Sequence, residues 1–241
     1  MELNSETSIG EIVRANYKTA RVFDQHKIDY CCKGDRTLKD ACAGAMVDEA
    51  FLVTKLKKVL ETFDSDSGYF EQMAPDDLCN YIVEHHHKYI NDNIPFIQQK
   101  LQKLCDVHGD NHKELFEIKK LFDQSAGNLS MHMKKEELML FPYIKRLVRS
   151  RSEGKKIETP NFGSIRNPVS VMMAEHQEEG ERFEHIAELT GDFTVPPDGC
   201  NTYRVGYQSL RDFKNDLHRH IHLENNILFQ RAAELEVAVL E

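Results

Sequence analysis

The 241-residue sequence lacks the features that would place it in a membrane or mark it for export. No apolar run approaches the roughly 18 residues that a membrane-spanning helix needs. The first residues, MELNSETSIGEI, have neither the basic start nor the apolar core of a signal peptide. We therefore expect a cytoplasmic protein that does not contact a membrane.

A basic surface and paired cysteine motifs are also missing. Acidic residues outnumber basic ones, giving a net charge of -9, and the two kinds are interspersed. Nucleic-acid binding needs a basic face, so nucleic acid is not an expected partner. The six cysteines include no CxxC pair, which leaves a zinc ribbon without support. We expect reduced thiols, with Cys42, Cys79, Cys105 and Cys200 in structural roles.

No stretch shows the alternation of apolar and polar residues that is typical of a β-strand, so the predicted fold class is all-α. Long helical patterns occupy residues 76–107, 111–149, 167–190 and 200–235. Four helices of this length favour an up-down four-helix bundle.

The domain boundaries follow from composition. Residues 1–62 form a block with two shorter helical patterns. The polar stretch at 63–77, with a glycine and a proline, is typical of a linker. The predicted organisation is a small helical N-terminal domain, a linker, and the bundle at 78–241.

An internal repeat is the most informative feature of the bundle. HMKKEELMLF (132–141) and HIHLENNILF (220–229) share the pattern H-x-x-x-E-x-x-x-L-F. His87 precedes the first copy by 45 residues, and His176 precedes the second by 44. Two similar helical hairpins are expected to pack with approximate two-fold symmetry.

Helix periodicity indicates which polar residues face the core. The apolar stripe of each long helix, stepping by three and four residues, includes a histidine. The histidines and glutamates on these stripes are His87, His132, Glu136, His176, His220 and Glu224. His86 also fits the first stripe and stays as an alternative to His87. The off-stripe histidines are expected to be exposed, namely His108, His112, His185, His218 and His222.

Six inward polar residues on four helices favour a metal site, because a buried glutamate without a partner is costly. One histidine on an apolar face would more often be a satisfied core residue. Imidazole mixed with carboxylate, without thiolate, suits iron or manganese better than zinc. Four histidines and two glutamates fit two metal ions, each held by two histidines, with both glutamates bridging.

These residues resemble the hemerythrin-like family. A ferritin-type site would need ExxH on two helices, and only Glu84–His87 matches that pattern. The motifs DYCCKGDRTL, HHHKYINDNIP, HMKKEELMLFP, MMAEHQEEG and HIHLENNILFQRA are similar, more specifically, to the repair of iron centres proteins of the YtfE/ScdA type. This resemblance covers nearly the whole chain, including the small N-terminal domain.

The resemblance implies two non-haem iron ions in an oxo- or hydroxo-bridged centre held by the six stripe residues. Gly180 stands where oxygen-carrying relatives have a further histidine, which implies a more open site. The implied function is repair of iron–sulfur clusters damaged by oxidative or nitrosative stress, through iron donation. A nitric oxide reductase and an O2- or iron-sensing module are the alternatives. Implied partners are damaged iron–sulfur proteins or a cluster scaffold, NO or O2 as small ligands, and a second copy in a homodimer.

Three further residues are candidates for functional roles. Adjacent Cys31 and Cys32 close only a strained ring with each other, so we expect them to meet a thiol, a metal ion or a nitrosyl. Lys33 and Arg36 are expected to lower their pKa. Our hypothesis is that the pair relays iron, electrons or NO near the iron exit; two small residues at a helix end are the alternative. Glu175 is expected to line a polar path and accept protons, unless it is simply a solvated surface residue.

Overall fold

A computed structural model describes residues 3–62 and 64–240 of the chain. In these residues the regular structure is helical, and the only β pairing described is an isolated antiparallel bridge between Ser8 and Thr37. The predicted all-α fold class is confirmed. None of the described helices is both long and apolar enough to cross a membrane.

The four long helical patterns are present, with ends shifted by a few residues. The first comprises α6 (Pro75–Tyr81), η2 (Ile82–His87) and α7 (Lys88–His108). The second comprises α8 (Glu114–Lys135), η3 (Glu136–Leu140) and α9 (Phe141–Glu153). The third is α10 (Arg166–Leu189), and the fourth comprises α11 (Asn201–Leu223), η4 (Glu224–Leu228) and α12 (Phe229–Leu240).

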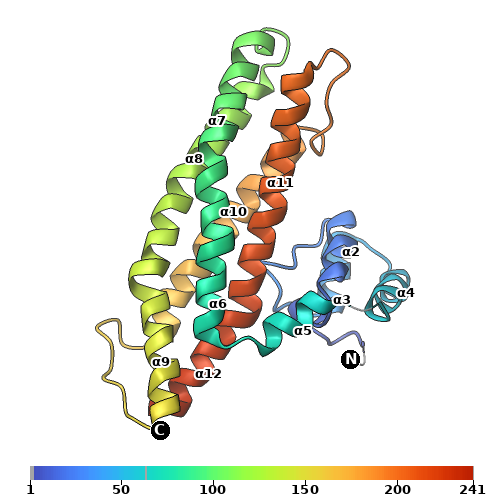
Figure 1. The fold of residues 1–241 in the computed structure, drawn as a ribbon. Helices are drawn as coiled ribbons and strands as arrows, with labels where there is room; N and C mark the ends of the chain where they lie inside the picture. The colour runs from blue at the N-terminus through green and yellow to red at the C-terminus, as the bar shows by residue number, and fades with distance from the viewer. Residues whose placement is uncertain (1–2, 63, 241) are drawn as a thin grey trace. The chain divides into compact units, whose positions relative to one another are not determined.

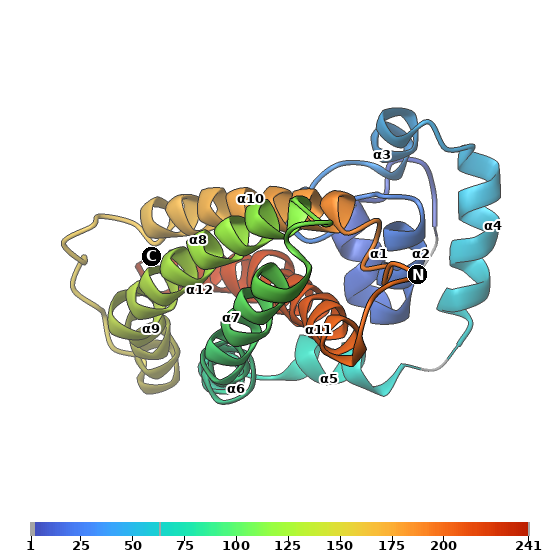
Figure 2. The ribbon, with the colours of Figure 1, turned by 90° about the horizontal axis from the view of Figure 1, so that it is seen from above.

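The chain divides into two compact units. One consists of Cys79–Tyr143 and Asn167–His220, and the other of Met1–Leu78, Ile144–Arg166 and Ile221–Glu241. In the first unit α7, α8, α10 and α11 run side by side as a four-helix bundle (Figures 1 and 2). Phe122, Phe183 and Phe213 are buried in its core, with ring centroids 5.4–6.4 Å apart. Burying one such ring contributes about 2–3 kcal/mol, so this core fixes the spacing of the helices.

The other unit contains the short helices of the N-terminal region. They are α1 (Ile9–Ala15), η1 (Tyr17–Thr19), α2 (Ala20–Gln25), α3 (Leu38–Ala45) and α4 (Glu49–Leu60). Side chains cap the starts of three of these helices: Ser8 and Glu11 form a capping box at α1, and the Thr37 and Asp48 side chains accept from N–H groups of α3 and α4. Such caps contribute about 1 kcal/mol each, which matters for helices this short.

Asn226 on η4 is packed against the backbone of the segment that carries the adjacent cysteines. It donates to the carbonyl of Tyr30 at 3.2 Å, and Asn225 donates to the carbonyl of Cys31 at 3.0 Å. A Cβ at Gly10 or Gly34 would lie 2.7 or 2.6 Å from Asn226 Oδ1, so both positions need glycine for this close approach. The cysteine segment is therefore held by backbone contacts to η4.

The segment expected as a linker contains the helix α5 (Ser65–Gln72). Phe70 is buried, the Asp64 carboxylate accepts from Tyr17 N–H at 3.0 Å, and Arg231 donates to the Met73 carbonyl at 2.7 Å. These contacts all lie in the unit that contains the N-terminal helices. Residues 64–73 are thus packed rather than extended, and the polar composition that suggests a linker reflects an exposed helix face.

Candidate metal centre

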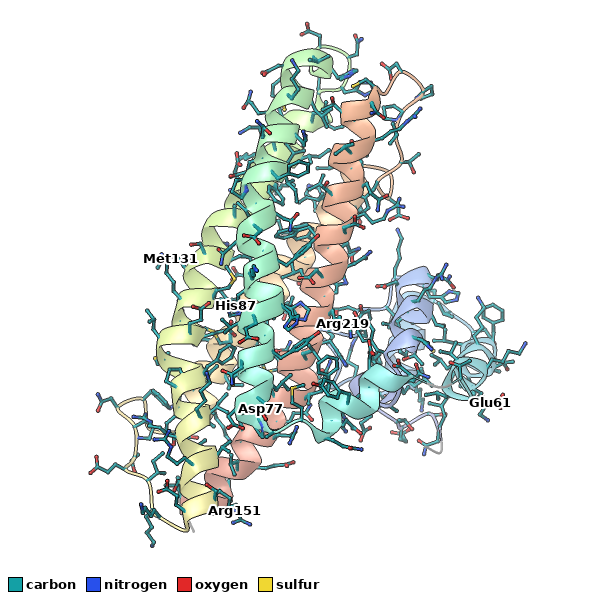
Figure 3. The ribbon with its side chains drawn as sticks, in the orientation of Figure 1. Glu61, Asp77, His87, Met131, Arg151 and Arg219 are labelled. Carbon is teal, nitrogen blue, oxygen red and sulfur yellow. The ribbon has the colours of Figure 1, made fainter. Side chains whose placement is uncertain are left out.

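The six stripe residues are all buried, each with 3% or less of its surface exposed. His87 ends η2, His132 lies in the last turn of α8, and Glu136 begins η3. His176 lies on α10 and His220 on α11, and Glu224 follows His220 by one turn at the start of η4. Figure 3 locates His87 on its helix and shows Met131, the neighbour of His132, pointing away from the bundle.

The side chains form two groups of four that could each hold a metal ion. His87 and His220 belong to one group, and His132 and His176 to the other. Glu136 and Glu224 belong to both groups, and within each group the ligand atoms lie within 4.8 Å of one another. Two neighbouring cations with bridging carboxylates would require this arrangement, in which two glutamates are shared by both groups.

The Glu136 carboxylate lies between two histidines. Its Oε2 is 3.3 Å from His87 Nε2, and its Oε1 is 3.4 Å from His132 Nε2. His132 Nε2 is in turn 3.0 Å from His176 Nε2. These short distances bring nitrogen and oxygen donors of three helical segments to one point in the core.

Two outer carboxylates fix the rings of His87 and His132. Glu137 lies 2.8 Å from His87 Nδ1, and Glu175 lies 2.9 Å from His132 Nδ1. A carboxylate on Nδ1 keeps the proton there and turns Nε2 toward the centre as a ligand atom. Burial raises the pKa of Glu175, but hydrogen bonds from Lys135 and His132 outweigh it and lower the pKa. Glu175 is therefore ionised and holds His132.

His86, the sequence alternative to His87, belongs to neither group. Its Nδ1 lies 3.0 Å from Asp216 Oδ1, and its ring stacks on His220 with centroids 5.5 Å apart and planes at 5°. The side chain is buried beside a member of one group. His86 thus supports the position of the His220 ring.

Sequence periodicity did not reveal that three of the six residues lie on π-helical turns. These turns are η2, η3 and η4, which carry His87, Glu136 and Glu224. A π turn inserts one extra residue and so re-aims side chains locally; such turns are frequent at functional sites. A stripe that steps by three and four residues fits an α-helix equally well, so the sequence pattern contains no signal for them.

Two groups of off-site predictions need correction. His218 and His222 are buried, not exposed, and the His222 ring packs against Tyr17 and Tyr30. Cys200 is exposed rather than structural. The stripe criterion failed for His222 because it considered only the bundle interior, whereas this ring is covered by aromatic residues of the N-terminal region.

Cys31 and Cys32 form a third group with Asp29. The two sulfur atoms lie 3.6 Å apart, and Asp29 Oδ1 accepts from both backbone N–H groups at 3.1 and 2.9 Å. The hydrogen bond with Cys32, burial and the charge of Asp29 raise the pKa of Cys31 well above its ordinary value. The prediction of a lowered pKa is therefore wrong for Cys31. Arg36 is directed instead to the carbonyls of Asp29 and Lys33.

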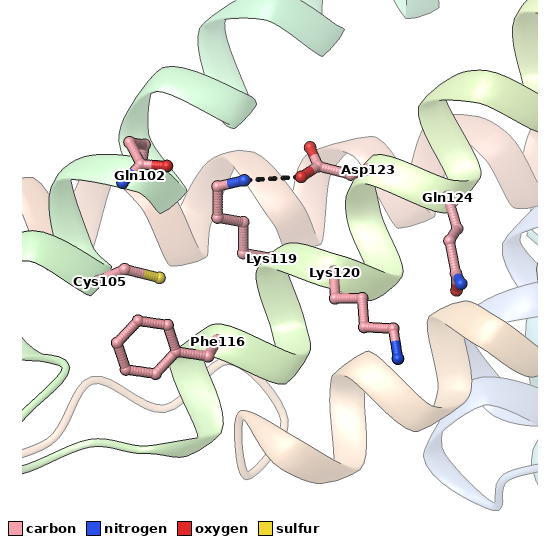
Figure 4. A pocket seen from close by; sticks show the side chains of 7 residues that line it. All are labelled: Gln102, Cys105, Phe116, Lys119, Lys120, Asp123 and Gln124. Atoms are coloured by element: carbon pink, nitrogen blue, oxygen red, sulfur yellow. Dashed lines mark hydrogen bonds and ion pairs between the residues drawn. The ribbon is translucent and has the colours of Figure 1, made fainter.

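A surface pocket between α7 and α8 contains none of these residues (Figure 4). It is lined by Gln102, Cys105, Phe116, Lys119, Lys120, Asp123 and Gln124. Two of its lining side chains, Lys119 and Asp123, form an ion pair at 2.7 Å. No member of either His/Glu group lines it, so we do not connect the pocket with metal binding.

Comparison with known proteins agrees with this geometry. Residues 80–232 match the model of the hemerythrin HHE cation binding domain, and residues 5–60 match ScdA_N, a domain of unknown function. The iron-sulfur cluster repair protein YtfE of Edwardsiella ictaluri is 33% identical over 224 residues, which cover 93% of this chain and 95% of that protein. The YtfE proteins of Musicola paradisiaca and Yersinia pseudotuberculosis serotype O:1b are 33% and 32% identical, with coverage of 94% and 93% of this chain and 96% of each relative.

The matches span both the long helices and the N-terminal region, and residues 80–232 contain the buried His/Glu groups that a cation-binding domain needs. The chain belongs to the hemerythrin-like family of cation-binding proteins, in the group of the YtfE/ScdA type.

Proposed function

We propose that the chain holds two iron ions and supplies iron for rebuilding damaged iron–sulfur clusters. The observation that carries the proposal is the pair of four-residue groups that share Glu136 and Glu224. His87 and His220 would hold one ion, and His132 and His176 the other. The relatives named as iron-sulfur cluster repair proteins support the assignment of this site to repair.

The donor set fits iron. Two carboxylates with almost no exposed surface would be costly in a protein core, and two divalent cations between them offset that cost. Imidazole and carboxylate without thiolate suit iron or manganese. When bound, iron supplies redox chemistry toward small ligands such as NO and O2, and it is also the material to be donated.

The surrounding residues give the site its orientation. Glu137 and Glu175 hold the protons of His87 and His132 on Nδ1, and Lys135 forms an ion pair with Glu175. On α10 only His176 belongs to a metal group, and Gly180, one turn later, has no side chain. Each ion would therefore have four protein residues as ligands. Such a set leaves positions open for exchange, which suits donation.

The proposal also assigns a role to Cys31 and Cys32, which is to receive iron. Two thiols and the Asp29 carboxylate offer three donors to an iron ion in transit. Because η4 carries Asn225 directly after Glu224, the Cys31 backbone is hydrogen-bonded to the residue that follows a shared glutamate. We propose that the pair takes up iron released by the bundle ligands. A Cys31→Ser/Cys32→Ser variant should keep its iron content but repair more slowly.

The experiment combines iron content with transfer. We expect about two iron ions per chain in protein from iron-replete cells, and far less in His132→Ala. Mixed with an iron–sulfur enzyme inactivated by NO, the loaded protein should lose iron as the enzyme regains activity. Continuous NO consumption without loss of iron would favour a nitric oxide reductase instead. Absence of iron from both the wild-type protein and the His132→Ala variant would remove the chemical basis of the proposal.

A further inference from the structure

A second cluster of reactive side chains lies at the end of the bundle where α7 ends and α11 begins. Cys200 directly precedes α11 and is exposed. His108, the last residue of α7, places its Nε2 3.3 Å from the Cys200 sulfur. Both residues belong to the same compact unit, and neither belongs to the His/Glu groups.

The turn before α11 fixes the position of the thiol. Gly199 N–H donates to the Pro196 carbonyl at 2.9 Å. A Cβ at Gly199 would lie 2.4 Å from Val195 Cγ1 and 2.9 Å from the Pro196 carbonyl oxygen, so a side chain would force this turn to shift. The tight turn delivers Cys200 to the start of a 23-residue helix, where backbone N–H groups favour a negative charge.

The His108 ring is held by neighbours from two segments, α11 and the loop between α7 and α8. It packs edge-on against Tyr203 of α11 with centroids 5.3 Å apart, and the His112 ring lies 6.3 Å away. His112 in turn is bound by Asp198 at 3.1 Å and by Glu114 at 3.0 Å. The titratable groups around the thiol are therefore two imidazoles, two carboxylates and one phenol.

Hydrogen bonds from His108 and from the N–H groups of Tyr203 and Thr202 lower the pKa of Cys200 to about 7. The other thiols with a resolved shift behave oppositely. The pKa of Cys31 is raised by its contact with Cys32 and by burial, and those of Cys42 and Cys105 are raised by burial. All six cysteines lie in the described ranges, and Cys200 is the exposed one.

We propose that the Cys200–His108 pair is a thiol–disulfide exchange site, at which Cys200 forms a mixed disulfide with a small-molecule disulfide such as glutathione disulfide. The Cys200 thiolate attacks one sulfur of the disulfide, a new S–S bond forms as the old one breaks, and the other half leaves as a thiolate that takes a proton from solvent. A free thiol reverses the exchange, so no further oxidant or reductant is needed. His108 acts as a positioning residue whose Nε2, 3.3 Å from the sulfur, favours the thiolate form of Cys200.

The test follows the rate of mixed-disulfide formation in the full chain by intact-protein mass spectrometry. Glutathione disulfide is the probe, and the rate is measured from pH 5 to 9. The wild-type protein should gain one glutathione, mapped to Cys200, and Cys200→Ser should lose the fast phase while keeping its metal content. His185→Gln, which changes an exposed histidine of α10, is the matched control for His108→Gln.

The pH dependence separates a role in ionisation from a structural role. Without His108 the thiol pKa should return toward about 8.5, and its thiolate, though rarer at pH 7, becomes intrinsically more nucleophilic. The net result is a rate about threefold lower at pH 7 and about threefold higher at pH 9 for His108→Gln. A mixed disulfide at another cysteine, or a His108→Gln profile that coincides with the control, would overturn the proposal.

Discussion

The two HxxxE repeats share a pattern but use the residues after the glutamate differently. In the first repeat Glu137 holds the Nδ1 proton of His87, and Leu138 is 80% exposed. In the second repeat the equivalent residues are Asn225 and Asn226, both buried and both hydrogen-bonded to the backbone of the cysteine segment. One repeat thus orients a candidate metal ligand, while the other anchors the segment with the adjacent thiols.

The comparison shows how one helical unit can be specialised without losing its ligand residues. The motif fixes His and Glu at one helical face, and the two positions that follow face other parts of the structure. Exchanging residues between the repeats is therefore the direct way to test whether these assignments are correct.

The largest effect is expected at the glutamates that both metal groups share. Glu136→Ala removes a donor from both groups, so we expect iron content to fall to nearly zero rather than by half. Replacement of His87, which belongs to one group, should spare part of the iron. Metal analysis of purified protein measures both, and Glu178→Gln, at an exposed position of α10, is the control. Equal iron in Glu136→Ala and the control would refute the shared-ligand arrangement.

The next largest effect is expected from replacing Asn226 of the second repeat with leucine, the residue that stands at the equivalent position, Leu138, of the first repeat. Asn226→Leu loses the hydrogen bond to Tyr30 and inserts a branched side chain against Gly10 and Gly34. We expect a loss of about 2–4 kcal/mol in the stability of the N-terminal region.

Urea unfolding combined with limited proteolysis measures this loss. The reverse exchange, Leu138→Asn, changes an exposed side chain and should alter stability by less than about 0.5 kcal/mol. Similar stabilities for the two variants would mean that Asn226 does not anchor the cysteine segment.

A third prediction separates Glu137 from Asn225. Glu137→Ala leaves His87 without its outer carboxylate, so iron affinity should drop roughly 10- to 100-fold. Asn225→Ala should leave affinity nearly unchanged but expose Cys31 and Cys32 to alkylation, because the Cys31 carbonyl loses its donor. Chelator competition and thiol labelling give the two readouts, and a loss of affinity in Asn225→Ala would contradict the division of roles.

The sequence was sufficient for the fold class and for the residues that gather in the core. Long stripes of apolar residues predict helices well, and a histidine in such a stripe faces inward whatever the details of the turn. The sequence did not predict the contacts between segments that are distant along the chain. Nothing in the residues near Asn226 indicates that Gly10 and Gly34 pack against it, and nothing in the spacing of the stripe residues indicates the π turns at Glu136 and Glu224.

The prediction for Cys31 failed for a related reason. Lys33 and Arg36 are close in sequence, but Arg36 donates to backbone carbonyls, while Asp29 faces the thiols. Spacing along the chain gives proximity, and only the folded backbone determines which charge faces the sulfur atom.

The smallest expected effect concerns Asp29, whose charge helps raise the pKa of Cys31. Asp29→Asn keeps an oxygen that can accept from the Cys31 and Cys32 N–H groups but removes the negative charge. The pKa of Cys31 should fall, and a shift of about half a unit would make its alkylation at pH 8 about threefold faster. Peptide mass spectrometry after iodoacetamide treatment measures the rate at Cys31, with Asp35→Asn, at an exposed position, as the control.

An unchanged alkylation rate would show that contact with Cys32 and burial alone keep Cys31 protonated. A faster rate would mean that Asp29 holds the proton on the thiol until a cation arrives. Metal binding to a thiol displaces its proton, so iron capture at the pair should then release protons and weaken as the pH falls. The second repeat would in that case anchor a segment whose Cys31 thiol stays protonated until iron reaches it, whereas the first orients ligands that stay in place.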